Sequence, residues 1–126
     1  MTEFEIRTLL YEEVGVSTTD FEFWLTSSFA VLVAGYYAFS KLNPDLQKTV
    51  QRLYVLVAIV FLVRWFSSMY IMYGYNLELS SLGVDVDLQI GPAIATVLQS
   101  LLMIFGTITV ASVLKKMGSD YGSQNT

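Results

Sequence analysis

Three long stretches of the chain are almost free of charge, and this feature constrains the fold most. Residues 23–40 and 88–114 contain no Asp, Glu, Lys or Arg, and residues 53–77 contain only Arg64. A helix needs roughly 20 apolar residues to cross about 30 Å of hydrocarbon, and each stretch can supply that length. Charged residues make up only 14% of the chain. The sequence therefore predicts an all-α membrane protein, a bundle of three transmembrane helices.

The chain is expected to form one integral membrane domain, residues 1–126, with a short N-terminal amphipathic helix before the spans. The expected segments are an interfacial helix at 1–16, spans at 20–41, 44–75 and 90–116, and a polar tail at 117–126. In the first segment, apolar residues from Ile6 to Val14 share one helix face. Packing of this helix over the mouth of the bundle is the alternative to the interface.

Local signals predict where the helices begin and end. Gly15 can end the first helix. Thr19 and Glu22 have the spacing of a capping box, which predicts the start of the first span. Asn43 followed by Pro44 predicts an N-cap and the first position of the second span, and Gly91-Pro92 starts the third in the same way.

The connection between the second and third spans alternates apolar and polar residues from Leu82 to Ile90. A two-residue period predicts a short strand or β-hairpin, with a short loop as the alternative. Asp85 and Asp87 would point the same way on such a strand. A solvated strand face explains them better than a weak cation site, because no further ligand spacing supports a site.

The charges sort by segment and predict the topology. Basic residues lie in the first connection, at the predicted start of the second span and at the end of the third: Lys41, Lys48, Arg52, Lys115 and Lys116. The N-terminal segment and the second connection are acidic instead. Basic residues in short loops stay on the cytoplasmic side. We therefore expect a multi-pass protein with its N-terminus outside and its C-terminus in the cytoplasm.

Arg64 is the costly residue, because an arginine at the centre of a spanning helix is unfavourable by about 2.5–3.5 kcal/mol on insertion scales. It should therefore face protein or water. Depth estimates place other polar residues near its level, and the predicted polar layer contains Arg64, Gln99, Ser67, Ser68, Thr26 and Glu22. Glu22 is the expected charge partner, directly or through a water, with completion of its own helix cap as the alternative.

Small side chains recur every four residues on two of the predicted spans. Ala30, Ala34 and Ala38 form such a ridge on the first, and Gly91, Ala95, Thr107 and Ala111 belong to a mixed ridge with Gln99 and Met103 on the third. Small residues at this spacing let membrane helices approach closely. Both ridges are predicted helix-packing surfaces.

Aromatic residues gather near the predicted membrane interfaces, as in the aromatic belt of membrane proteins. Trp24 and Tyr54 lie close to the ends of the first and second spans, and further tyrosines lie near the other ends. A pocket for a quinone or another aromatic ligand is the less favoured alternative.

The chain contains no Cys and no His. Thiolate chemistry and histidine chemistry, including the usual haem ligand, are therefore excluded. No phosphate-binding loop, nucleophile elbow or pair of acids at membrane depth is present. We therefore expect no enzyme activity, cofactor or metal, and no nucleic-acid partner.

These features favour a structural or assembly subunit of a homo- or hetero-oligomeric membrane complex, in a bacterial inner membrane or a membrane-containing virus. Its expected partners are the lipid bilayer, further copies of itself or other membrane subunits. The alternative is a homo-oligomeric pore in which Arg64 lines an anion-favouring path. In its three spans, outside N-terminus, inside C-terminus and basic-then-polar tail, the chain resembles the layout of three-span phage holins. A membrane enzyme or carrier is the least favoured class.

Overall fold

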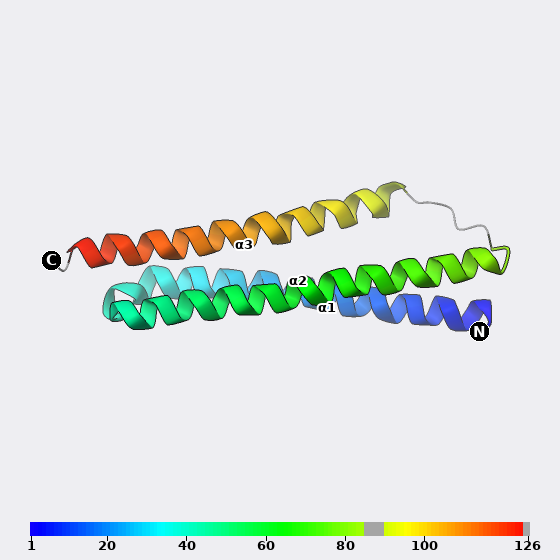
Figure 1. The fold of residues 1–126 in the computed structure, drawn as a ribbon, viewed down its shortest axis with the longest axis horizontal. Helices are drawn as coiled ribbons and strands as arrows, with labels where there is room; N and C mark the ends of the chain where they lie inside the picture. The colour runs from blue at the N-terminus through cyan, green and yellow to red at the C-terminus, as the bar shows by residue number, and fades with distance from the viewer. Residues whose placement is uncertain (85–89, 125–126) are drawn as a thin grey trace.

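The computed structural model describes the chain except residues 85–89 and 125–126, and at 90–93 and 120–124 it describes the backbone alone. It contains three long helices, α1 (Glu3–Ala38), α2 (Pro44–Ser81) and α3 (Ile90–Gln124), and a short 3-10 turn, η1 (Phe39–Lys41). Figure 1 shows an elongated molecule in which α1 and α2 form an antiparallel hairpin and α3 lies along it. We call the end of the bundle at η1 the turn end and the opposite end the N-terminal end.

Each helix is long and apolar enough to cross a membrane, over Glu3–Lys41, Pro44–Ser81 and Ile94–Ser119. In the most apolar windows of these segments only 22%, 17% and 17% of the residues are buried, so most apolar side chains face outward. An outward apolar surface of this extent suits lipid and not water. The chain is therefore a multi-pass membrane protein of three helices, as the charge-free stretches predict.

Helix α1 is continuous, so the break predicted at Gly15 is absent. The Thr19 hydroxyl donates to the carbonyl of Gly15 within the helix, and Thr19 and Glu22 form no capping box. Contacts with other helices account for the continuity, because Ile6 and Ser17, on either side of Gly15, are both buried. Packing on both sides outweighs the roughly 1 kcal/mol that a helical glycine costs relative to alanine.

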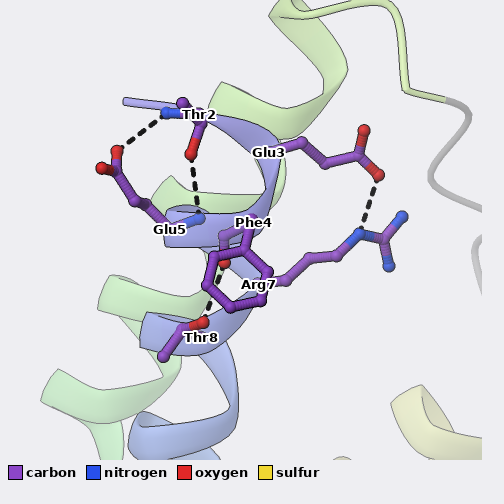
Figure 2. Close-up of polar contacts among 6 residues, drawn as sticks. All are labelled: Thr2, Glu3, Phe4, Glu5, Arg7 and Thr8. Carbon is purple, nitrogen blue, oxygen red and sulfur yellow. Dashed lines mark hydrogen bonds and ion pairs between the residues drawn. The ribbon is translucent and has the colours of Figure 1, made fainter.

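The capping box lies instead at the start of the chain, where Thr2 is the N-cap of α1. The backbone N–H of Glu5 donates to the Thr2 hydroxyl, 3.2 Å, and the Glu5 carboxylate accepts from the Thr2 N–H, 2.9 Å (Figure 2). Arg7 donates to Glu3 one turn before it, 2.9 Å. Carboxylates in the first turn also match the helix dipole. These contacts stabilise the free end of a helix of 36 residues.

The predicted start of α2 is confirmed, and its cause is local. Asn43 is the N-cap and its side-chain oxygen accepts from the N–H of Leu46, 2.8 Å, with Pro44 at the first helical position. Pro44 lacks an N–H, which would be unpaired there in any case. Helix α2 then continues to Ser81 instead of ending at 75, and α3 continues to Gln124, through most of the segment predicted as a tail.

The connection from α2 to α3 is only partly described. Gly83 has φ +78°, a left-handed conformation that suits glycine, and follows the last turn of α2. The predicted strand or hairpin between Leu82 and Ile90, with Asp85 and Asp87, falls mainly on residues outside the described part of the chain. Elsewhere, in residues 1–84 and 90–124, the regular structure is entirely helical.

A core runs along the axis of the bundle from the turn end past its middle. Its buried members are Trp24, Phe39, Tyr54, Ala58, Trp65, Met103, Val110 and Leu114. At the turn end, a Cβ on Gly35 would lie only 3.1 Å from Leu114 and 3.3 Å from Met117. The absence of a side chain at Gly35 therefore allows α1 and α3 to approach closely.

Candidate functional site: polar contacts between the helices

Arg64 of α2 forms an ion pair with Asp20 of α1. Its Nε donates to the Asp20 carboxylate at 3.0 Å. The two side chains differ in exposure: that of Asp20 is 5% exposed, whereas that of Arg64 is 57% exposed. The carboxylate is therefore held inside the bundle, and most of the guanidinium remains on its outer surface.

The predicted pairing of Arg64 with Glu22 is not present, and the rotation of α1 explains why. Residues four apart on a helix share a face. Asp20, Trp24 and Ser28 follow this spacing and all three are buried. Glu22 follows Asp20 by two residues, about 200° around the helix, and is exposed.

The other members of the predicted polar layer do not gather around Arg64. Gln99 is half-buried on α3 and Ser68 is buried on α2, whereas Ser67 and Thr26 are exposed. The structure brings Arg64 to Asp20 and not to any of these four side chains. Within one chain, the residues of the predicted polar layer therefore do not form a single group of contacts around Arg64.

Trp24 connects α1 to α3 in the middle of the bundle. Its indole N–H donates to the Thr107 hydroxyl at 2.9 Å, and both side chains are buried. The neighbouring Gly106 makes room for the ring, since a Cβ there would lie 2.8 Å from Cη2 of Trp24. Trp24 is therefore a packing and hydrogen-bonding residue of the bundle, and its place in an aromatic belt stays a prediction.

Two further pairs of side chains join α2 to its neighbours. Tyr54 and Ser28 share a hydrogen bond of 2.8 Å between α2 and α1. The indole N–H of Trp65 donates to Ser100 of α3 at 2.8 Å, and Ser100 donates to the carbonyl of Thr96. Like Trp24, Tyr54 was expected at an interface and is buried. Both aromatic residues place a polar group where it is paired inside the bundle.

At the turn end, two glutamines of α2 bind backbone carbonyls. Gln51 donates to the carbonyl of Leu114 at 3.1 Å, joining α2 to α3. Gln47 donates to the carbonyls of Phe39 and Leu42, which lie in and just after η1. The carbonyl of Phe39 also accepts from the N–H of Leu42, and the carbonyl of Leu42 follows the end of η1, where helix hydrogen bonding stops. The turn is therefore held by side chains of the helix that follows it.

The two predicted packing ridges have different places in the structure. Ala30 and Ala34 are exposed and Ala38 is half-buried, so the ridge on α1 is largely outside the core. On α3, Thr107 is buried against Trp24, Ala111 is half-buried and Ala95 is exposed. The Gly91 position belongs to the part of α3 described by its backbone alone. Whether the ridge on α1 contacts a second chain stays a prediction.

A pattern in the sequence indicates the helix face that makes these contacts, although the predicted polar layer does not include its residues. Asp20, Trp24 and Ser28 form a polar series at four-residue spacing. Such a series on one face of a membrane helix predicts a face turned toward protein, because polar groups there need partners. The series indicates the face, but the partners on α2 and α3 depend on how the helices are placed beside one another.

Comparison with protein-family models, curated proteins and solved structures gives no match. The function is therefore argued from the fold and these contacts.

Proposed function

We propose that this chain is a non-enzymatic membrane protein that acts as a structural or assembly subunit, packing on copies of itself or on other membrane subunits. One observation carries the proposal: polar side chains inside the bundle join its own helices at several points, while long apolar faces remain uncovered. Trp24, Tyr54 and Trp65 each bind a hydroxyl on another helix. This arrangement suits a rigid building unit with outward contact surfaces.

The ridge on α1 supports the same proposal. Ala30 and Ala34 are small, spaced by four residues and exposed in the single chain. A surface of this kind allows the close approach of a further helix. Packing against a second chain would cover this ridge, which the contacts within the chain leave exposed.

The test is the mass of the protein in nanodiscs, with and without a bulky side chain on the ridge. The subunit proposal expects an oligomer, or a complex with another membrane protein when purified from native membranes. We expect Ala34→Leu to reduce the oligomeric fraction several-fold, because the added side chain prevents close approach. Val33→Leu is the matched control at an exposed neighbouring position. Equal effects of both variants would mean that the alanine spacing has no role in assembly.

For the topology, we propose that the N-terminus lies outside and the C-terminus in the cytoplasm. Five basic residues are exposed and lie toward the turn end, namely Lys41, Lys48, Arg52, Lys115 and Lys116. The bond from Gln51 to Leu114 supports this grouping, since it brings the neighbouring Arg52 and Lys115 to one level. Such a basic end favours the cytoplasmic side.

Cysteine labelling tests this topology, and the chain has no cysteine of its own. Ser81→Cys should react with an impermeant reagent added outside, and Ser123→Cys only after access from the cytoplasmic side. Reaction of both from the same side would contradict three spans.

A pore is the second candidate, and the exposure of Arg64 favours it. The Arg64 side chain is 57% exposed on the outside of the three-helix unit, so a ring of copies could turn its guanidinium toward a shared axis. There it would attract anions and repel cations. Ion flux into liposomes would support this candidate, with Arg64→Glu expected to reverse the ion preference. Absence of flux from an intact oligomer would exclude it.

A further inference from the structure

Helix α2 carries a second apolar face whose residues recur at alternating intervals of three and four. We call this face the α2 seam; its members are Leu56, Ile59, Val63, Phe66, Tyr70, Tyr73 and Leu77. A mean spacing of 3.5 residues sustained over three heptads is the pattern of a helix that supercoils with another helix. Along α2 the pattern spans roughly 32 Å at about 1.5 Å per residue.

Neither α1 nor α3 covers this seam. All seven side chains are between 48% and 79% exposed. The face of α2 that packs on α1 and α3 is a different one, with Tyr54, Ala58, Trp65 and Ser68 buried. Helix α2 therefore has one face packed against α1 and α3 and one apolar face left uncovered within the described chain.

The middle of the seam contains a shallow and largely open depression. A shallow apolar hollow on α2 is lined by Val63, Phe66, Ser67, Tyr70 and Ile71. The first four lie at positions i, i+3, i+4 and i+7, which are the four residues that form a hole in knobs-into-holes packing. In a parallel in-register pair of such helices, the knob that enters this hole is the residue equivalent to Phe66.

Charge along α2 defines what the seam can contact. Between residues 56 and 77 the only charge is that of Arg64, two residues from Phe66 and therefore about 200° around the helix. Arg64 is also paired with Asp20 on the other side of α2. The occupant of the seam must therefore present an uncharged apolar surface with the same spacing, and a second α2 does so.

The alignment of α1 with α2 argues for a protein occupant and against lipid alone. Because Asp20 lies at the level of Arg64, the seam beyond Phe66 runs beside the half of α1 that carries Glu12 and Glu13. The burial of Ile6 and Leu79 is consistent with the two helices staying together as far as the N-terminal end. Four charges on α1, from Glu12 to Glu22, make this half costly to place in hydrocarbon. A protein surface is therefore a better cover for Tyr70, Tyr73 and Leu77 than acyl chains.

We propose that the α2 seam pairs with the same seam of a second copy in a parallel, in-register, two-fold symmetric contact. Copies inserted in one orientation present α2 in the same direction, and a two-fold axis brings each residue to its own equivalent. Phe66 of each copy enters the hollow of the other. This inference rests on the proposed self-association and identifies the surface that carries it.

Single cysteines test the seam, since the chain has none of its own. Phe66→Cys and Tyr73→Cys, oxidised in native membranes, should give a covalent dimer. Val57→Cys is the matched control, because Val57 is 43% exposed but lies nine residues from Phe66, on the opposite side of α2. We expect at least a tenfold higher dimer yield at the two seam positions than at the control.

The mass in nanodiscs separates failure of the seam from failure of the proposed function. An oligomer that crosslinks through Ala34→Cys but not along the seam would overturn this inference and leave the subunit proposal standing. A protein that is monomeric in nanodiscs and purifies without any other membrane protein would overturn both. Equal dimer yields at Phe66→Cys and Val57→Cys would also overturn the seam, since random collision explains them.

Discussion

At the turn end of the bundle all three helices pack together, with Phe39 and Leu114 fully or almost fully buried. At the N-terminal end, by contrast, the buried apolar residues are Ile6 of α1 and Leu79 of α2. Figure 1 shows α3 diverging from the hairpin toward this end, and Ile94, Val97 and Leu98 near its start are all more than half exposed. The two ends are therefore stabilised by different interactions.

The difference shows how polar residues are used along one membrane bundle. Toward the turn end, neutral donors bind neutral acceptors between helices, as Tyr54 does with Ser28 and Gln51 with Leu114. Nearer the N-terminal end, the ion pair of Arg64 with Asp20 lies beside the neutral bond from Trp65 to Ser100. Neutral pairs cost little to place deep among apolar side chains, whereas a charged pair requires access to water or headgroups. The charged contact therefore lies nearer the N-terminal end than the neutral contacts at Tyr54 and Gln51.

The largest effect should come from removing Arg64, which would weaken the N-terminal half. Arg64→Ala leaves the Asp20 carboxylate, 5% exposed, without its charged donor. We expect a loss of about 1.5–3 kcal/mol in the free energy of unfolding, measured in mixed micelles. Asp20→Ala should cost less, because the Arg64 side chain is 57% exposed and its guanidinium can reach water or headgroups. A larger loss for Asp20→Ala than for Arg64→Ala would contradict this asymmetry.

Two replacements of glycine by alanine should change the stability in opposite directions, one in the crowded middle of the bundle and the other in the open N-terminal half. A Cβ on Gly106 would lie 2.8 Å from the buried ring of Trp24, whereas one on Gly15 would have nothing within 4 Å. We expect Gly106→Ala to destabilise the protein by about 1–3 kcal/mol through overpacking. Gly15→Ala should stabilise it by about 0.5–1 kcal/mol, since alanine favours helix. Thermal unfolding followed by circular dichroism measures the change in stability of each variant. Changes in the same direction would show that the two sites are packed alike.

The smallest effect is expected for a single neutral hydrogen bond. Thr107→Val keeps the side-chain shape but removes the acceptor of the Trp24 indole N–H. Interhelical hydrogen bonds in membrane proteins contribute about 0.6 kcal/mol on average, so we expect a loss of that order. Thr109→Val is the control, because Thr109 is exposed and donates only to the carbonyl of Phe105 in its own helix. A loss at Thr109 as large as that at Thr107 would mean that the bond to Trp24 contributes nothing specific.

The sequence by itself determined the class of fold, the number of long helices and the start of α2. These properties depend on composition and on neighbouring residues: the charge-free stretches predict spanning helices, and Asn43 with Pro44 starts α2 through a bond to Leu46. The ends of the helices were less predictable. Thr19 has the right spacing for a cap but lies inside α1, because packing on both sides of Gly15 keeps the helix continuous.

Only the tertiary structure decided the partner of Arg64 and the location of the aromatic residues. Asp20 and Glu22 have the same charge and almost the same depth, and they differ in direction by about 200° around α1. Hydropathy and charge along the chain do not define how each helix is rotated and shifted against its neighbours. In this bundle, that placement brings Asp20 of α1 to Arg64 of α2. The packing at Gly35 and Gly106 sets how closely α1 and α3 approach, and it brings Trp24 to Thr107.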